Sequence, residues 1–248
     1  MPGDRQPRMM VVFGGSRGIG AAVARLGAAR GWQVLLTYNS AAAEADAVVR
    51  EIAAAGGTAS AVPCNVADED AIAHAMAQAA ALGPIGAMVY SSGITGDASP
   101  LADASAQTLR QVVDVNLIGA MIAAREGVRA MSTRLGGSGG SITFISSRAA
   151  DRGSAGEYVW YAATKGGVNS LALGLGREVA TEGIRVNCVS PGPVATDMMT
   201  PERQAKGAAA VPMQRVATPE EIAEAVLFIA SDAASYVTGS NLVAAGGA

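Results

Sequence analysis

Several kinds of residue are scarce in this chain of 248 residues. Aromatic side chains make up 4% of it and charged side chains 16%, below the ~25% typical of soluble domains. So low a charge content hints that much of the surface is buried between subunits. The two cysteines, Cys64 and Cys188, lack CxxC spacing, and the single histidine is His74. We therefore expect no metal site, and two buried, inert thiols in a reducing compartment.

The sequence also lacks the signals of several kinds of partner. With a formal net charge of -3 and no run of Lys or Arg, nothing points to nucleic acid or to an anionic membrane. No apolar stretch long enough to span a bilayer is free of Gly, Pro and charge, and residues 1–8 lack the apolar region of a signal peptide. We expect a cytoplasmic protein with a flexible segment at 1–8.

What the chain does have is a regular alternation of short apolar runs with longer helical segments. This pattern indicates right-handed crossovers and a parallel sheet covered on both faces. The sequence predicts a single α/β domain over 9–248, a doubly wound Rossmann-type fold of about seven parallel strands with helices on both faces. The expected strands are 9–13, 32–37, 58–63, 85–90, 141–145, 184–189 and 241–243, and the expected helices are 19–30, 41–55, 68–82, 105–135, 159–181 and 218–231.

The first predicted strand runs into a glycine-rich turn, GGSRGIG at 14–20, where the first helix begins. Glycines let the backbone approach a pyrophosphate, and the helix N-terminus supplies free N–H groups and the positive end of the helix dipole. A glycine cluster alone also fits a purely structural turn. Its position between the first strand and the first helix favours a dinucleotide site.

A second pattern carries chemistry. Tyr161 and Lys165 are four residues apart in the helix predicted at 159–181, so both lie on one face of it. Ser146 and Ser147 end the preceding strand, at the edge where open α/β sheets bind ligands. A YxxxK pair alone occurs by chance, so its weight comes from its place after the fifth strand.

These motifs resemble the short-chain dehydrogenase/reductase family over nearly the whole chain, from 9 to 247. The glycine spacing is GxxxGxG, typical of that family, rather than the GxGxxG of long-chain dehydrogenases. The resemblance implies an NAD(P)(H)-dependent oxidoreductase acting on CH–OH groups. Its catalytic residues would be Asn116, Ser147, Tyr161 and Lys165. The spacing from serine to tyrosine is one residue longer than is common in the family, so Ser146 stays as the alternative to Ser147.

The implied roles follow from the residue types. Tyr161 would be the acid in reduction and the base in oxidation, although free tyrosine has a pKa of ~10. Lys165, with the cationic nicotinamide, would favour the phenolate. Ser147 would hydrogen-bond the substrate oxygen, and in the family Asn116 holds a water that links Lys165 to solvent.

The same resemblance assigns the cofactor residues. No acidic residue that could bind ribose hydroxyls follows the second strand before Glu44, which lies inside the next predicted helix. Arg17 lies where basic side chains often meet a 2′-phosphate, so we expect NADP(H), with NAD(H) as the alternative. A solvated loop charge is the other interpretation of Arg17. The predicted cofactor-binding residues are Gly14, Ser16, Arg17, Gly18, Ile19, Gly20, Asn39, Ser40, Asn65, Val66, Ser92, Gly93, Tyr161, Lys165, Pro191, Gly192, Val194 and Thr196.

Three positions depart from the family pattern. Phe13 stands where a threonine usually helps to hold the glycine turn, so another contact must replace that hydroxyl. Tyr90 stands in place of the first Asn after the fourth strand, and Asn65 in place of the Asp that faces adenine. These departures motivate one alternative function, a nucleotide-binding protein without catalysis. The intact catalytic set argues against it.

The substrate is not readable from the sequence. A lid at about 194–212 and the loop 94–100 would select a small-molecule carbonyl or alcohol. The runner-up activity is 3-oxoacyl-carrier-protein reduction, which needs a basic docking face; Glu182 weighs against it, while Arg129 and Arg134 could contribute. The family suggests a homotetramer, with Gly166, Gly167, Ser170 and Gly174 allowing close helix contact.

Overall fold

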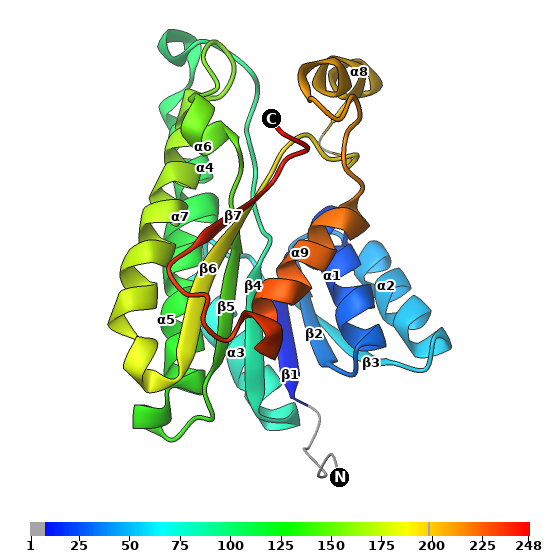
Figure 1. The fold of residues 1–248 in the computed structure, drawn as a ribbon, viewed down its shortest axis with the longest axis vertical. Helices are drawn as coiled ribbons and strands as arrows, with labels where there is room; N and C mark the ends of the chain where they lie inside the picture. The colour runs from blue at the N-terminus through cyan, green and yellow to red at the C-terminus, as the bar shows by residue number, and fades with distance from the viewer. Residues whose placement is uncertain (1–7, 198) are drawn as a thin grey trace.

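The computed structural model describes residues 8–197 and 199–248. Its centre is a seven-stranded, all-parallel sheet in the order β3-β2-β1-β4-β5-β6-β7 (Figure 1). The predicted fold class is confirmed, with every predicted strand present to within two residues. The strands are β1 (Met9–Phe13), β2 (Gln33–Tyr38), β3 (Thr58–Pro63), β4 (Ile85–Tyr90), β5 (Gly140–Ile145), β6 (Ile184–Pro191) and β7 (Asn241–Ala244).

Helices cover both faces of this sheet. The helices α3 (Glu69–Leu82), α5 (Gly119–Met131) and α7 (Val159–Glu178) pack on one face. The helices α1 (Gly18–Ala29), α2 (Ala42–Ala54) and α9 (Pro219–Ala230) pack on the other (Figure 1). Successive residues of a buried strand point to opposite faces, which is why all five residues of β1 are buried and divide between the two cores.

The long helix predicted at 105–135 is divided in the structure. It consists of α4 (Ala106–Val113), a π turn (Asp114–Ile118), α5 and a short 3₁₀ turn (Thr133–Leu135). A π turn widens the helix by one residue and often marks a functional site. Here it contains Asn116, whose side chain is fully buried.

Strand order reverses between β1 and β4, and the chain leaves these two strands in opposite directions. In open α/β sheets the crevice at this point, beyond the carboxyl ends of the strands, binds ligands. Two short helices, α6 (Ala149–Arg152) and α8 (Pro201–Ala210), stand above that edge, at the top of Figure 1. The crevice therefore lies between the sheet and these helices.

Two predicted segments fall partly outside the described residues. Residues 1–7 of the segment expected to be flexible lie outside them, and so does residue 198 of the expected lid at 194–212. Within the lid, α8 begins at Pro201 with its N-terminus capped by the Thr200 hydroxyl. Across the described part of the chain, none of the helices combines the length and apolar character needed to cross a membrane.

Candidate active site

A cleft of about 1210 Å³ opens at the carboxyl ends of the strands. It exceeds the 300–1,000 Å³ usual for drug-sized ligands, leaving room for a dinucleotide and a substrate. The predicted catalytic residues Ser147, Tyr161 and Lys165 line it, as do all the predicted cofactor residues except Gly20. Gly20 and the predicted catalytic residue Asn116 are not among the residues that line it.

The glycine turn fits close approach of a ligand to the backbone. Gly14 and Gly18 have φ values of 76° and 53°, the left-handed region that favours glycine. A Cβ on Gly20 would overlap the Gly14 carbonyl, so Gly20 allows α1 to begin close against the turn. Gly20 thus has a packing role, and its predicted contact with the cofactor stays a prediction.

The contact that replaces the missing threonine comes from β2. Phe13 is fully buried, and the backbone N–H of Gly14 donates a 3.2 Å hydrogen bond to the Thr37 hydroxyl. The N–H of Gly15 donates to the Thr37 carbonyl at 2.9 Å. Thr37 thus ties the turn to the end of β2, a role that the sequence did not reveal.

The first turn of α1 has the character of an anion site. Among the described residues, no side chain caps this helix, whereas Asp68, Ser105, Thr200 and Thr218 cap four others. Uncapped N–H groups at the positive end of a helix dipole can bind a pyrophosphate. Arg17, at the N-cap position, lines the same cleft. These residues fit a dinucleotide.

The side chains predicted to meet the adenosine differ in whether they are already hydrogen-bonded within the chain. Asn39 and Ser40 follow β2 and line the cleft with Val66. The side-chain oxygen of Asn65 accepts a 3.1 Å hydrogen bond from the Ala67 N–H, which closes a turn two residues long. This bond uses one lone pair of the Asn65 oxygen, which leaves the other for the predicted contact with adenine.

Tyr161 and Lys165, the predicted acid–base pair, lie on the first two turns of α7. Lys165 Nζ donates a 2.7 Å hydrogen bond to the Ile145 carbonyl and lies 5.6 Å from the centre of the Tyr161 ring. Burial lowers the pKa of the Lys165 ammonium to about 8. Burial also raises the pKa of the Tyr161 hydroxyl, against the opposing effect of a hydrogen bond from Ser147. A lysine with a pKa near neutral pH can release and regain a proton.

The two candidate serines have different surroundings. The Ser146 hydroxyl is buried and donates a 3.2 Å hydrogen bond to the backbone carbonyl of Lys165. Both residues line the cleft, but the Ser147 hydroxyl accepts from the Ala149 N–H at 3.1 Å and also hydrogen-bonds the Tyr161 hydroxyl, which opposes the rise that burial causes in the pKa of Tyr161. This arrangement favours Ser147 as the residue that faces a substrate oxygen.

The Asn116 side chain links the π turn to the loop after β4 and to α7 by hydrogen bonds. Its side-chain oxygen accepts from the Ile94 N–H, and its amide group donates to the Ile94 carbonyl, both at 2.9 Å. The amide also donates to the Thr164 hydroxyl at 3.2 Å, on the turn of α7 between Tyr161 and Lys165. A methyl group on Gly93 would occupy the space between Asn116 and the Lys165 ammonium, 3.5 Å from each.

The other departures from the family pattern touch one another. Phe13 and Tyr90 are neighbours across β1 and β4, with ring centres 5.9 Å apart, and Tyr90 lies 6.5 Å from Phe144 on β5. The buried Tyr90 hydroxyl donates a 2.6 Å hydrogen bond to the Val115 carbonyl in the π turn. Tyr90 therefore supports the turn that holds Asn116, rather than meeting a cofactor.

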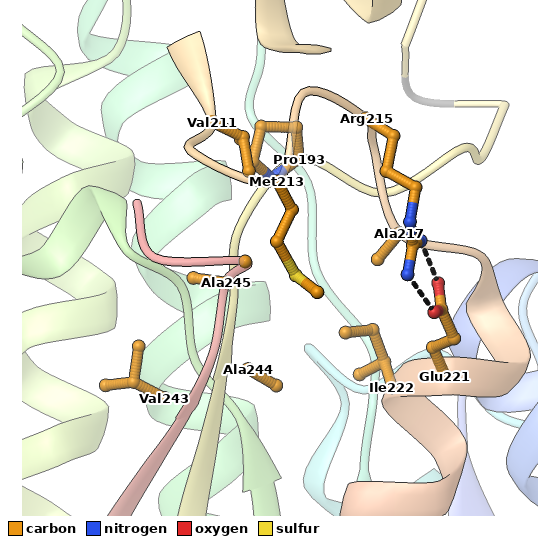
Figure 2. Close-up of a pocket in the computed structure, with 11 residues that line it drawn as sticks. Pro193, Val211, Met213, Arg215, Ala217, Glu221, Ile222, Val243, Ala244 and Ala245 are labelled. Atoms are coloured by element: carbon orange, nitrogen blue, oxygen red, sulfur yellow. Dashed lines mark hydrogen bonds and ion pairs between the residues drawn. The ribbon is translucent and has the colours of Figure 1, made fainter.

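A smaller cavity of about 280 Å³ lies between Pro193, Val211, α9 and β7 (Figure 2). Met213 points into it, and Arg215 and Glu221 form a two-bonded ion pair at its rim, at 2.7 and 2.6 Å. Pro193 is a wall of both this cavity and the cleft. Because its lining is largely apolar and its charges are paired, this cavity supplies no group for chemistry.

Comparison with known proteins agrees with this geometry. A family model described as enoyl-(acyl carrier protein) reductase matches residues 14–248. The chain is 40% identical over 245 residues to an uncharacterized oxidoreductase of Escherichia coli, YgfF, covering 96% of this chain and 98% of that one. It is 38% identical over 244 residues to a cis-4-hydroxycyclohexanecarboxylate dehydrogenase of Sinomonas cyclohexanicum, covering 97% and 96%. A blue fluorescent protein from a metagenomic library, solved with NADPH, superposes with a TM-score of 0.90 at 33% identity, covering 97% of each chain.

Fold and site together define an oxidoreductase that uses a dinucleotide. The chain belongs to the short-chain dehydrogenase/reductase family. It is an NAD(P)-dependent enzyme that interconverts a carbonyl and an alcohol.

Proposed function

We propose that this enzyme is an NADP(H)-dependent carbonyl reductase or alcohol dehydrogenase with Tyr161 as its acid and base. The observation that carries the proposal is the placement of Tyr161, Ser147 and Lys165 around one point of the cleft, at the carboxyl end of β5. The uncapped first turn of α1 would bind the pyrophosphate, and Arg17, Asn39 and Ser40 would meet the adenosine ribose and its 2′-phosphate.

Each of these residues would have a separate role in hydride and proton transfer. NADPH supplies a hydride, or NADP⁺ accepts one. Ser147 would donate a hydrogen bond to the substrate oxygen, which stabilises negative charge developing there. Tyr161 would give its proton to that oxygen in reduction and take it back in oxidation. Lys165 would stabilise the remaining phenolate by its charge, and Asn116 would hold the turn of α7 on which both residues stand. The water-holding role of Asn116 stays a prediction.

Titration with NADPH and with NADH, followed by fluorescence or calorimetry, tests the cofactor assignment. We expect tighter binding of NADPH, and Arg17→Ala should weaken NADPH by about tenfold while leaving NADH within twofold, since one charged contact to the 2′-phosphate is worth about 1.5 kcal/mol. An equal loss of affinity for both cofactors would mean that Arg17 contacts the pyrophosphate or that the variant is misfolded. Binding of neither would reject the proposal.

The substrate is to be found by a screen of small carbonyls and alcohols with NADPH and NADP⁺. The hydroxycyclohexanecarboxylate oxidised by the Sinomonas relative is a reasonable first compound. Reduction of a carrier-protein thioester is less favoured, because Arg134 and Arg129 are paired with Glu182 and Glu126 and so present little free positive charge. Tyr161→Phe should abolish turnover with cofactor binding retained, whereas a non-catalytic binding protein would show no turnover before the substitution.

We further propose a homotetramer built on two exposed apolar surfaces. Gly166 and Gly174 of α7 face open space, and large apolar side chains nearby are about two-fifths exposed. Gly167, expected on the same face, instead packs on Leu117 of its own chain. One surface carries the exposed side chains of Ile118 in the π turn, Met121 on α5 and Leu173 on α7, and the other carries Phe228, Tyr236 and Val243 around α9 and β7. Light scattering tests this, and a monomer would refute it. The cytoplasmic location stays a prediction.

A further inference from the structure

One side chain of the lid helix reaches the loop that precedes the catalytic helix. Arg203 of α8 donates a 2.6 Å hydrogen bond to the Tyr158 hydroxyl and a 3.0 Å hydrogen bond to the Glu157 carboxylate. Its guanidinium also lies over the Tyr158 ring, 5.0 Å from the ring centre. Lys206, one turn further along α8, comes within 4.0 Å of the same carboxylate.

Tyr158 connects this contact to the opposite wall of the cleft. Its ring, 8% exposed, meets the Trp160 ring edge-on with centres 6.3 Å apart. The Trp160 indole N–H donates a 2.7 Å hydrogen bond to the Thr95 carbonyl. The Ser99 N–H donates to the backbone carbonyl of Glu157 at 3.0 Å. The loop after β4, the start of α7 and the lid helix are therefore joined beside the catalytic tyrosine.

Little else holds the lid helix down. None of the ten residues of α8, all of them described, is buried. A helix without buried apolar contacts is held by few interactions and opens easily. The contacts of Arg203 are therefore a large share of what keeps α8 over the cleft.

We propose that Arg203 is a positioning residue that latches α8 over the substrate end of the cleft, with Tyr158 and Glu157 as its partners on the opposite side. The proposal rests on the proposed function only in taking that end of the cleft as the place where substrate binds. Because Glu157 balances the Arg203 charge, the arginine holds the lid rather than an anionic substrate. The latch thereby limits the height of the substrate pocket and retains a bound substrate while hydride moves.

The test needs no known substrate. Trp32→Phe leaves Trp160 as the single tryptophan, a reporter at the centre of the latch. In that background, Arg203→Met should raise acrylamide quenching of Trp160 about twofold and speed hydrogen exchange of peptides covering 199–210 about fivefold, because the lid opens more often. Arg25→Met is the matched control, since Arg25 pairs with Glu51 on α1 and α2 at similar exposure. It should change neither signal.

A charge exchange separates a latch from a general loss of structure. Glu157→Arg alone should open the lid, and adding Arg203→Glu should restore both signals, because a carboxylate at 203 can accept from the Tyr158 hydroxyl and pair with an arginine at 157. Thermal unfolding and NADPH titration of each variant check that the fold and the cofactor site persist.

Two results would overturn the latch. One is wild-type quenching and exchange in Arg203→Met, in a variant whose thermal unfolding matches that of the parent. The other result concerns 4-oxocyclohexanecarboxylate, the ketone that corresponds to the hydroxycyclohexanecarboxylate. If this anion increases quenching of Trp160 in the parent and has no effect in Arg203→Met, Arg203 binds the carboxylate of a substrate and gives up its contact with Glu157. Failure of the parent protein to bind NADPH would instead count against the proposed function and would leave the quenching comparison valid.

Discussion

Replacing Lys165 with Met removes a charge from a place where water cannot solvate it. The residue is 5% exposed, and burial lowers the pKa of its ammonium from 10.5 to about 8. The unfolded chain binds the proton more tightly than the folded protein does, so this lysine opposes folding at pH 7. The difference in pKa corresponds to about 3 kcal/mol of unfolding free energy.

The size of the effect should vary with pH in one direction. Between pH 8 and pH 10.5 the folded protein has released this proton while the unfolded chain still holds it, so unfolding takes up a proton and wild-type stability rises with pH. The ionisation cost therefore falls from about 3 kcal/mol at pH 7 to about 2 kcal/mol at pH 9. Loss of the hydrogen bond to the Ile145 carbonyl offsets about 1 kcal/mol. Lys165→Met should thus stabilise the fold by about 2 kcal/mol at pH 7 and about 1 kcal/mol at pH 9.

Urea unfolding followed by circular dichroism measures this difference. Protein concentration must be held fixed, because assembly would shift the apparent stability. Lys206→Met is the matched control: its side chain is 83% exposed, so removing that charge relieves no burial. A stability difference between Lys165→Met and wild type that is the same at pH 7 and pH 9 would refute the reasoning. The stabilised variant should also lose turnover, as expected where a catalytic group is held at a cost to folding.

Four further substitutions test the rest of the site. Ser147→Ala should lower kcat by roughly 10²–10³-fold, as loss of an oxyanion donor does. Ser146→Ala should keep kcat and lower the unfolding free energy by about 1 kcal/mol. A larger loss of kcat in Ser146→Ala than in Ser147→Ala would assign the catalytic role to Ser146. Tyr90→Phe leaves the Val115 carbonyl without its partner and should destabilise the protein by about 1–3 kcal/mol in urea unfolding. Gly119→Ala would drive a Cβ into the Tyr90 hydroxyl and the Val66 carbonyl, so we expect a drop in melting temperature from about 1–3 kcal/mol of overpacking, and an unchanged melting temperature would show that the π turn can shift.

The elements that depend on local periodicity could be predicted from the sequence. Continuous apolar runs identify strands covered on both faces, and a spacing of four places Tyr161 and Lys165 on one side of a helix wherever that helix lies. The glycine turn was recognisable because its chemistry depends on residues adjacent in the chain. These parts of the fold and site need no knowledge of distant contacts.

The parts that were missed all depend on contacts between distant segments. Thr37 takes over from the residue at 13 only because the ends of β1 and β2 lie side by side, 23 residues apart in sequence. Arg203 and Tyr158 are 45 residues apart, in segments without a recognisable pattern. The π turn is held by contacts from outside the helix: the Tyr90 hydroxyl donates to the Val115 carbonyl, and the Ile94 backbone is hydrogen-bonded to Asn116. Its cause is therefore tertiary.

The position of Thr37 has a consequence for any redesign of cofactor preference. This residue anchors the glycine turn, and it lies two residues before the pair Asn39 and Ser40, which is proposed to meet the ribose. Where the family's usual threonine holds the turn from β1, the end of β2 is free to vary. Here the end of β2 both holds the glycine turn and leads into the segment proposed to bind the ribose. A substitution that introduces an acidic residue at 39 to favour NAD(H) must therefore leave the backbone of β2 unchanged. Otherwise the glycine turn would shift, and the affinity for both NAD(H) and NADP(H) would fall.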